Sequence, residues 1–525
     1  MQNKPGMSSV AVAVKLLAAA VAMGGVMGAA SAAAPDYTRV IVKFKAGHGA
    51  SLKSAVASAK GNVKHEIFGM DAMAIEVPLT ALKGLQNNPN VEYVEEDVIR
   101  RPFALTSAST GTPYALGQLV PYGIKQTQSD LLPDTYVANR KVCIIDSGID
   151  RAHEDLTANS VNITGQFDSG TGNWYTDENS HGTHVAGTIA AVNNSGMGVV
   201  GVNSNKRLKL HIVKVFGAAG WAYSSTLSSA ANQCAAAGAN VISMSLGGAA
   251  SSTTESNTFA SLQSKGILNI AAAGNDGNTV VSYPAGYSSV MMVGAVDEFK
   301  AWATFSQYNS KMEIAGPGVQ VLSTVPMNTG SASELKVSTT TYKPGANTGS
   351  PYRVATAPLA DFGLGDRTTA TVSGKVCLIA RGTVDFATKV MNCQNSGGVG
   401  AVIYNNVAGG FGGTMGTTVA AIPSVTASDA EGAAMKSQLG LSATVTVKQT
   451  SYSYFDGTSM ATPHVAAVAA LVWSYFPTCT GAQIRSSLTK SAQDLGPVGR
   501  DVKFGFGLVQ AKTAYDRIRL NGCGV

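Results

Sequence analysis

Residues 37–100 alternate between apolar and polar positions with the period of two that is typical of β-strands. Between these stretches lie segments with helical spacing. The pattern predicts a small α+β unit near the start of the chain. Its expected strands are 40–44, 72–77 and 91–98, and its expected helices lie around 51–60 and 79–86.

From about residue 117 to 333 the apolar runs become nearly continuous and alternate with helical segments. Strands that are apolar on both faces are typical of a parallel sheet covered by helices on both sides, so we expect an α/β fold here. The runs that carry this prediction are 142–145, 210–215, 241–245 and 268–272, with a helix over 224–237.

Residues 334–448 interrupt this pattern, because they are rich in Thr, Val and Gly and favour strands. After them, residues 461–475 form a helical stretch of small apolar residues, so the α/β pattern resumes. The segment 334–448 is therefore predicted to be a mostly β domain inserted into the α/β fold.

The first 32 residues have the features of a secretory signal peptide. Two lysines precede an apolar run at 16–27, and the small residues 30–32 form an A-x-A-like cleavage site. A membrane anchor is the alternative, but the run is shorter than the roughly 20 residues that a spanning helix needs. We expect a secreted, extracellular protein without a membrane anchor, with the periplasm as the alternative destination.

The charge of the chain argues against a nucleic-acid partner. Charged residues make up 13% of the 525 residues, about half of the usual share of roughly 25%, and the formal net charge is +6. No strong basic field results, so nucleic acid is not an expected partner.

The six cysteines are expected to form disulfides, since their number is even and the chain is expected to be exported. None forms a C-x-x-C pair, which argues against zinc. Buried free thiols are the alternative. Two cysteines lie 16 residues apart in one segment, two lie in the C-terminal tail, and two remain, which gives the pairs Cys377–Cys393, Cys479–Cys523 and Cys143–Cys234.

Three motifs supply the groups that acyl transfer requires. Asp146 ends an apolar strand in DSGID, His181 opens HGTHVAG before a helix, and Ser459 is the centre of GTSMA at the start of another helix. Ser459 would be the nucleophile, His181 the base, and Asp146 the group that orients the imidazole. His184, Asp150 and His464 also lie in these motifs, but we interpret them as packing or supporting residues.

These motifs resemble the signatures of the subtilase family. Their order Asp, His, Ser is that of subtilisin, and the serine motif lacks the final glycine of the α/β-hydrolase elbow. A further segment, AAAGN ending at Asn275, resembles the family segment whose asparagine donates its side-chain amide to the oxyanion. The resemblance implies a subtilisin-like parallel sheet and a serine endopeptidase with Asn275 and the Ser459 N–H in its oxyanion hole.

The resemblance also implies where the substrate lies. In the family, the segment matching 245–248 pairs with the substrate as an added strand, and residues before the asparagine help to wall the pocket for the side chain preceding the cut. No acidic residue stands in either segment, so broad specificity with an apolar or aromatic preference is expected. The implied substrate-binding residues are Ser245, Leu246, Gly247, Ala273 and Gly274.

A structural Ca²⁺ is implied in the same way. Its ligands would all be oxygen atoms, as this hard cation prefers. The loop after the catalytic histidine is one residue longer than the common pattern, and an ordinary polar surface loop is the alternative. The implied ligands are the side chains of Gln118, Asp155 and Asn194 and the carbonyl groups of Val192, Met197 and Val199.

Two further segments resemble domains that accompany subtilases. Residues 37–103 resemble the inhibitory prodomain, which implies self-cleavage between Arg101 and Gly117, and 374–382, 386–390 and 400–406 resemble a protease-associated (PA) domain. For the prodomain-like segment the alternative is an independent binding module. For the PA-like segment the alternative is an inert spacer. The predicted organisation is signal peptide 1–32, prodomain 37–103, catalytic domain 117–333 and 449–525, and inserted PA domain 334–448.

The main interpretation is a secreted endopeptidase, expected to be a monomer, that acts on proteins or peptides and is inhibited by its own prodomain. The first alternative is an exopeptidase that removes short N-terminal peptides. A non-enzymatic binding protein on the same fold is the second, and the intact Asp146, His181, Asn275 and Ser459 argue against it. An esterase is the third, and the order of the motifs disfavours it.

Overall fold

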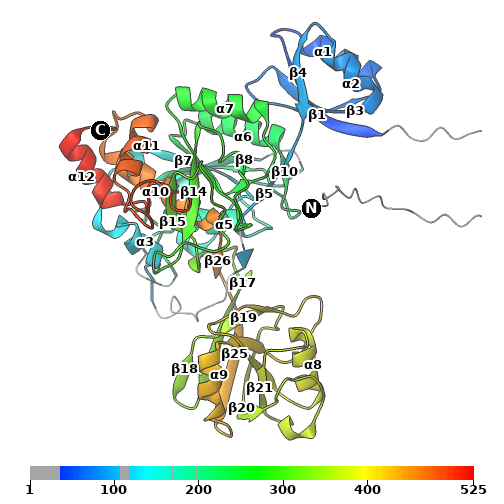
Figure 1. Ribbon diagram of the computed structural model, residues 1–525, viewed down its shortest axis with the longest axis vertical. Coiled ribbons are helices and arrows are strands. Elements are labelled where there is room, and N and C mark those ends of the chain that lie inside the picture. The colour runs from blue at the N-terminus through cyan, green and yellow to red at the C-terminus, as the bar shows by residue number, and fades with distance from the viewer. Residues whose placement is uncertain (1–35, 104, 107–116, 168–169, 195, 197) are drawn as a thin grey trace, which may run out of the picture.

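The computed structural model describes residues 36–103, 105–106, 117–167, 170–194, 196 and 198–525 (Figure 1). The predicted signal peptide and the predicted calcium ligand Met197 lie outside the described residues. A central body carries a small α+β block on one side and a larger, mostly β block on the opposite side. Within the described residues, no helix has the length and apolar character needed to cross a membrane.

A seven-stranded sheet forms the centre of the body, and all of its neighbouring strands are parallel. This arrangement confirms the predicted α/β fold. The order of the strands is β15 (Ile314–Pro317), β14 (Val290–Val296), β13 (Leu268–Ala272), β11 (Val241–Met244), β7 (Lys141–Asp146), β9 (Lys209–Lys214) and β8 (Ile163–Phe167).

Both faces of this sheet are buried under helices, which explains the continuous apolar runs. Val142 and Ile144 of β7 pack in one core with α5 (His181–Ala190) and α10 (Thr458–Tyr475). Cys143 and Ile145 point to the other face and share a core with α6 (Ser224–Ala236) and α7 (Thr253–Ser264). Further helices of the body are α3 (Tyr122–Gln126), α4 (Glu154–Thr157), α11 (Gly481–Lys490) and α12 (Ala511–Asn521).

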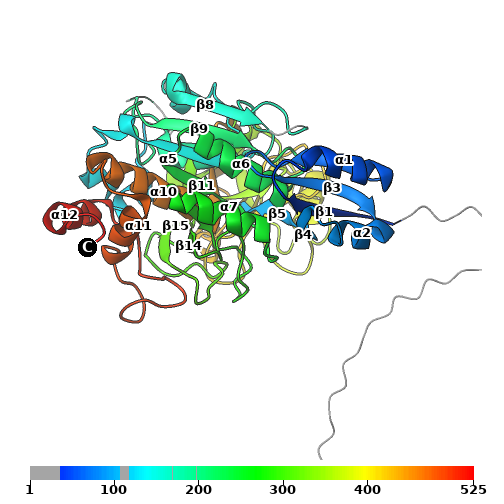
Figure 2. The same ribbon diagram turned by 90° about the horizontal axis from the view of Figure 1, so that it is seen from above.

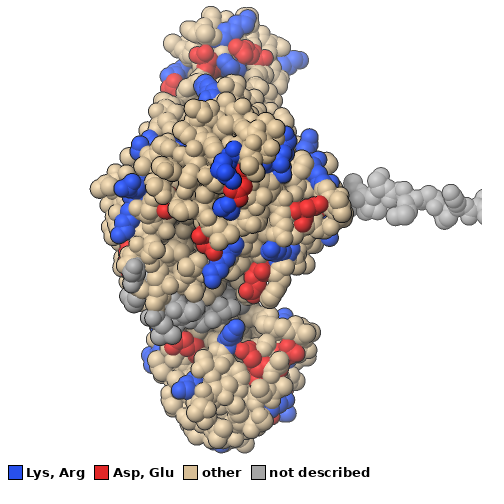
Figure 3. All heavy atoms as spheres, turned by 90° about the vertical axis from the view of Figure 1, so that its left-hand side faces the viewer, with Lys and Arg blue, Asp and Glu red and all other residues tan. Residues whose placement is uncertain are grey.

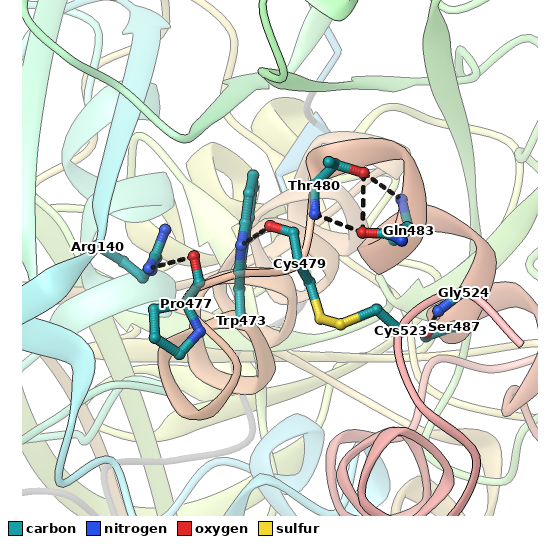
Figure 4. Close-up of a disulfide and its surroundings, with 9 residues drawn as sticks. All are labelled: Arg140, Trp473, Pro477, Cys479, Thr480, Gln483, Ser487, Cys523 and Gly524. Atoms are coloured by element: carbon teal, nitrogen blue, oxygen red, sulfur yellow. Dashed lines mark hydrogen bonds between the residues drawn. A yellow bond between two sulfur atoms is a disulfide. The ribbon is translucent and has the colours of Figure 1, made fainter.

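Three disulfides join the predicted pairs Cys143–Cys234, Cys377–Cys393 and Cys479–Cys523. Figure 4 shows the third one, which ties the start of α11 to the C-terminal tail beyond α12. Close to it, Trp473 Nε1 donates a hydrogen bond of 2.8 Å to the Cys479 carbonyl oxygen. The tail is thereby fixed to the helices that cover the sheet.

The α+β block is an antiparallel sheet in the order β2 (Asn62–Glu66), β3 (Ala72–Pro78), β1 (Tyr37–Phe44) and β4 (Val91–Glu96), with α1 (Gly49–Ser58) and α2 (Leu82–Gln86). It lies beside α6 and α7 in both ribbon views (Figure 2). Glu95 accepts hydrogen bonds from Thr253 N (2.7 Å) and Thr254 N (2.8 Å) at the start of α7. Asp97 accepts one from Ser225 N (2.9 Å) at the start of α6, so each helix N-terminus receives a carboxylate.

The mostly β block has nine strands and the helices α8 (Phe386–Asn395) and α9 (Asp429–Lys436). The chain enters through β17 and leaves through β25, and these strands pair from Gly330↔Thr450 onward, so both connections lie together as in an inserted domain. The strand order is β18 (Thr340–Tyr342), β17 (Gly330–Val337), β25 (Ser442–Thr450), β20 (Arg353–Asp361), β21 (Val376–Ala380), β22 (Gly400–Tyr404), β24 (Ser424–Ala427), β19 (Gly345–Thr348) and β23 (Gly413–Thr414).

Charged side chains are sparse and of both signs on the face shown in Figure 3. Most of that face consists of uncharged residues. This distribution agrees with the small formal net charge of +6.

Candidate active site

The three side chains of the predicted triad come from three different elements of the body. Asp146 is the last residue of β7, His181 is the first residue of α5, and Ser459 is the second residue of α10. All three are almost fully buried. They meet where β7 ends, the edge at which parallel α/β sheets build their sites.

The structure joins Asp146 and His181 directly. The Nδ1 atom of His181 lies 2.7 Å from Oδ1 and 2.9 Å from Oδ2 of Asp146. A carboxylate accepts hydrogen bonds, so Nδ1 is the ring nitrogen that donates here, and in the neutral imidazole this tautomer leaves the lone pair on Nε2. Ser147 N also donates to Asp146 Oδ1 (2.7 Å), which fixes the carboxylate.

Asp177 supports the start of α5 and was not identified from the sequence. Its buried carboxylate accepts hydrogen bonds from Ser147 Oγ (2.8 Å), Ser180 N (2.9 Å) and Thr183 N (2.9 Å). These bonds connect the loop after Asp146 to the first turn of the helix that carries His181. Burial raises the pKa of Asp177. The signal that could have revealed it is an acidic residue shortly before a helix start.

The Ser459 hydroxyl is engaged with the chain's own backbone. Its Oγ donates to the Ser245 carbonyl oxygen (2.8 Å) and accepts from Phe103 N (3.0 Å). No hydrogen bond between Ser459 and His181 is found among the described residues, and His181 Nε2 is buried without a partner. The Ser459 hydroxyl must therefore turn from the Ser245 carbonyl oxygen toward His181 Nε2 before His181 can take its proton.

Two donors converge on the carbonyl oxygen of Phe103. Asn275 Nδ2 donates at 2.9 Å and Ser459 N donates at 3.3 Å. Thr458 holds the amide of Asn275 in place, because its backbone N and its Oγ1 each lie 2.9 Å from Asn275 Oδ1. Donors arranged in this way stabilise negative charge that develops on a carbonyl oxygen.

Residues 99–103 lie in the cleft as an added strand. Strand β5 (Ile99–Pro102) pairs antiparallel with β10 (Ala222–Tyr223) on one edge and with β12 (Leu246–Gly247) on the other. Phe103 N also donates to the Ser245 carbonyl oxygen (3.2 Å). A backbone ladder of this kind binds an extended peptide whatever its side chains are.

The five predicted substrate-binding residues fall into two groups, of which one pairs with the bound strand and the other does not. Ser245, Leu246 and Gly247 pair with residues 101–103, and a Cβ atom at Gly247 would lie 2.7 Å from the Phe103 ring. Ala273 N donates to Val293 O (3.0 Å) and Gly274 N to Thr458 Oγ1 (3.1 Å), so these two residues lie against β14 and Thr458. The sequence did not point to β10 as the second edge.

The chain continues on the far side of Ser459 with a shorter pairing. Strand β6 (Leu105–Thr106) pairs antiparallel with β26 (Tyr452–Asp456), which in turn pairs with β16 (Val321–Thr324). Phe103 therefore lies between two paired segments, with its N–H 3.0 Å from the Ser459 hydroxyl oxygen.

The described residues predicted to bind calcium lie close together. Gln118 Nε2 is 2.8 Å from Val192 O and 3.2 Å from Val199 O, and Asn194 Nδ2 is 3.0 Å from Asp155 Oδ1. Asp155 is fully buried. One carboxylate, two side-chain amides and two carbonyl groups supply oxygen atoms, so the chemistry of this donor set fits a hard cation.

His184 and His464 are buried within the packed interior. His184 Nε2 lies 3.0 Å from the Val321 carbonyl oxygen, and its ring stacks on Phe455 with centroids 4.4 Å apart. Burial lowers the pKa of His184 to about 3 and that of His464 to about 4, so both are neutral at pH 7. Asp150 accepts from Ala152 N (3.0 Å) and Met327 N (2.9 Å), which stabilises the turn after Asp146.

Comparison with known proteins agrees with this geometry. A model of the subtilase family matches residues 138–350 and 387–507, and a model of the fervidolysin N-terminal prodomain matches residues 26–97. The chain belongs to the subtilase family. It is a serine endopeptidase with an N-terminal prodomain.

Individual subtilases resemble the chain over much of its length. Subtilisin E from Bacillus subtilis (strain 168) is 38% identical over 301 residues, which cover 55% of this chain and 74% of that protein. An alkaline protease from Shouchella clausii is 37% identical over 268 residues, covering 50% and 65%. The crystal structure of a psychrophilic subtilisin-like protease from the Antarctic psychrotroph Pseudoalteromonas sp. AS-11 is 40% identical with a TM-score of 0.63, covering 78% of this chain and all of that one.

Proposed function

We propose that this subtilase is a secreted endopeptidase that cuts its own chain between Phe103 and Ala104 and then hydrolyses other proteins. One observation carries the proposal: the Phe103 carbonyl oxygen is held by Asn275 Nδ2 and Ser459 N, with the Ser459 hydroxyl beside it. A chain held in this way has the position of a substrate. The signal-peptide features of residues 1–32 support export, with the periplasm as the alternative destination.

The chemistry would proceed through an acyl-enzyme. Ser459 Oγ attacks the carbonyl carbon of Phe103 while His181 Nε2 takes the hydroxyl proton, and Asp146 stabilises the imidazolium through Nδ1. The charge that develops on the Phe103 oxygen is stabilised by Asn275 and the Ser459 N–H. His181 then donates its proton to the nitrogen of Ala104 as the bond breaks, and water hydrolyses the ester by the reverse use of the same groups.

The residue before the cut supports the predicted preference for apolar or aromatic side chains. Phe103 lies against Gly247, and the groove around it is lined by Gly248, Ala249, Asn275 and Asp276. A glycine at 247 leaves room for a ring. The backbone ladder on both edges supports broad tolerance at the other positions.

The test compares the wild type with Ser459→Ala in processing and in casein hydrolysis. Removal of the nucleophile should lower turnover by about a millionfold and leave the prodomain attached. Ser474→Ala is the matched control, because this buried serine lies in the same helix and donates to the Leu471 carbonyl oxygen. Equal processing of the wild type and Ser459→Ala would mean that another protease matures the chain.

We also propose that Gln118, Asp155 and Asn194, with the carbonyl groups of Val192, Met197 and Val199, hold a structural Ca²⁺. The ion would tie the loop after α5 to α4, which Asp155 belongs to. Calcium at about 100 times its dissociation constant adds roughly 2.7 kcal/mol of stability. We expect EDTA to lower the melting temperature of the wild type but not of Asp155→Asn, and an EDTA-insensitive wild type would exclude the site.

For the inserted block we propose a role in substrate access. Residues 346 and 348–352 line a cavity together with Ser180 and 453–455 of β26, the strand that pairs with β6 beyond the cut. Large substrates that extend past the cut would meet this wall. Deletion of 334–448 should change the ratio of casein to short-peptide hydrolysis, and an unchanged ratio would indicate an inert spacer.

A further inference from the structure

A buried ion pair connects the bound strand to the body of the enzyme. Arg100 is the fourth residue before the Phe103–Ala104 bond, and its Nε and Nη2 atoms lie 2.9 Å and 2.6 Å from Oε1 and Oε2 of Glu255. The Arg100 side chain is 1% exposed and that of Glu255 is 0% exposed. The neighbouring Arg101 is exposed to solvent. Of these adjacent arginines, one is therefore fully enclosed by the enzyme.

Glu255 belongs to the part of the enzyme that remains after the prodomain has gone. It lies in the first turn of α7, where Glu255 N donates to the N-cap Ser252 Oγ (3.2 Å). The Tyr287 hydroxyl donates a hydrogen bond of 3.0 Å to Glu255 Oε2 and so helps to fix the carboxylate. Glu255 and its contacts with Ser252 and Tyr287 therefore remain in the enzyme after the prodomain has left.

The shape of the pocket fits a guanidinium group. A Cβ atom at Gly248 would lie 3.2 Å from Arg100 Nη1 and 2.6 Å from the Ile99 carbonyl oxygen, so glycine at this position keeps the space open. The fork of Arg matches a carboxylate with two parallel hydrogen bonds, whereas Lys offers a single ammonium group. A buried carboxylate that lacks such a partner is strongly disfavoured.

The register of the bound strand does not depend on Arg100. The pairings Arg100↔Ala222 and Arg101↔Gly247 are made by backbone groups, which every substrate possesses. A peptide cut by Ser459 in the same register would place its fourth residue before the cut against Glu255. This argument rests on the proposed function, since it uses the Phe103–Ala104 bond to set the register.

We infer that Glu255 is a specificity-determining residue that makes the mature enzyme prefer arginine at the fourth position before the cut. Protein substrates would then be selected at two points, by an apolar or aromatic residue next to the cut and by an arginine three residues earlier. The same preference would let the enzyme recognise its own precursor at Arg100.

The first test uses the mature wild type and therefore depends on no variant. The substrates are peptides of the form Xaa-Arg-Pro-Phe, blocked at the N-terminus, with a chromogenic amine after Phe and with Arg, Lys, Ala, Leu or Glu as Xaa. We expect kcat/KM with Arg to exceed that with Ala by about tenfold or more, with Lys between them. Equal values for Arg and Ala, or the highest value for Leu, would overturn the inference. Failure to cut any of the peptides would instead contradict the proposed function.

The second test assigns the preference to Glu255. Glu255→Gln should reduce the ratio of kcat/KM for Arg over Ala to about two or less, because the neutral amide no longer pairs with the charge. Glu313→Gln is the matched control: Glu313 forms a comparable pair with Arg485, whose Nε lies 2.6 Å from Oε1, outside the cleft. The control should keep the ratio of the wild type. A Glu255→Gln enzyme that keeps this ratio would also overturn the inference.

Discussion

The two halves of the cleft hold the chain very differently. Before the Phe103–Ala104 bond, β5 pairs on both edges and Arg100 forms a buried ion pair, whereas the residues that the structure describes directly after the bond, 105–106, pair with β26 on one edge. Glu95 and Asp97 add carboxylates at the starts of α7 and α6 on the side before the bond. Cleavage would therefore free the chain after the cut while the prodomain stays bound.

Under the proposed cleavage, this asymmetry would let one segment act first as substrate and then as inhibitor. The pairings of β5 that position Phe103 would also retain the prodomain once the bond is broken. The cleaved prodomain would still be held by the half of the cleft before the cut. It would leave the site slowly, so activity would appear later than cleavage.

The largest effect is expected at the bond. Asn275→Ala removes the side-chain donor to the Phe103 oxygen, and we expect a fall in kcat of about a hundredfold to a thousandfold. Self-cleavage should slow by a similar factor. The measurement is steady-state hydrolysis of a short peptide, with the exposed Asn521→Ala in α12 as control. A loss of less than about tenfold would argue against an oxyanion role.

The next effect concerns the half before the cut. Arg100→Ala leaves Glu255 without its partner, so the cleaved prodomain should dissociate faster by about 30-fold, the equivalent of roughly 2 kcal/mol. The interval between cleavage and the appearance of casein hydrolysis reports this release. Arg101→Ala is the matched control, since that side chain is exposed. The same interval for both variants would show that the ion pair contributes nothing to retention.

The smallest effect is expected in the half after the cut. Leu105→Pro combined with Thr106→Pro removes both backbone N–H groups of β6, so self-cleavage should slow by about fivefold. Release of the prodomain should be unchanged, because β6 belongs to the enzyme chain and not to the prodomain once the bond is broken. Leu105→Ala combined with Thr106→Ala keeps both N–H groups and serves as control. Slower release of the prodomain in the double proline variant would contradict the proposed asymmetry.

The sequence predicted the central sheet because its physical signal is local. Val142 and Ile144 face one layer of helices and Cys143 and Ile145 the other, and this burial requires an apolar run that is visible in the chain. The motifs around Asp146, His181 and Ser459 were visible for a similar reason, since each is a short stretch at the end of one element.

Other parts of the site arise between elements and have no local signal. Glu255 lies 155 residues from Arg100 along the chain, and nothing in the sequence shows that these two charges meet. Strand β10 has two residues, too few for a period-two pattern. The sequence limited the cut to the interval from Arg101 to Gly117, whereas the hydrogen bonds to the Phe103 oxygen point to a single bond.

The central claim is that Ser459 cuts the chain after Phe103, and the mass of the released prodomain tests it most directly. Intact-mass measurement of freshly matured wild type should give a fragment whose last residue is Phe103, and Ser459→Ala should give no such fragment. A fragment that ends at another residue, or the same fragment from Ser459→Ala, would contradict the account.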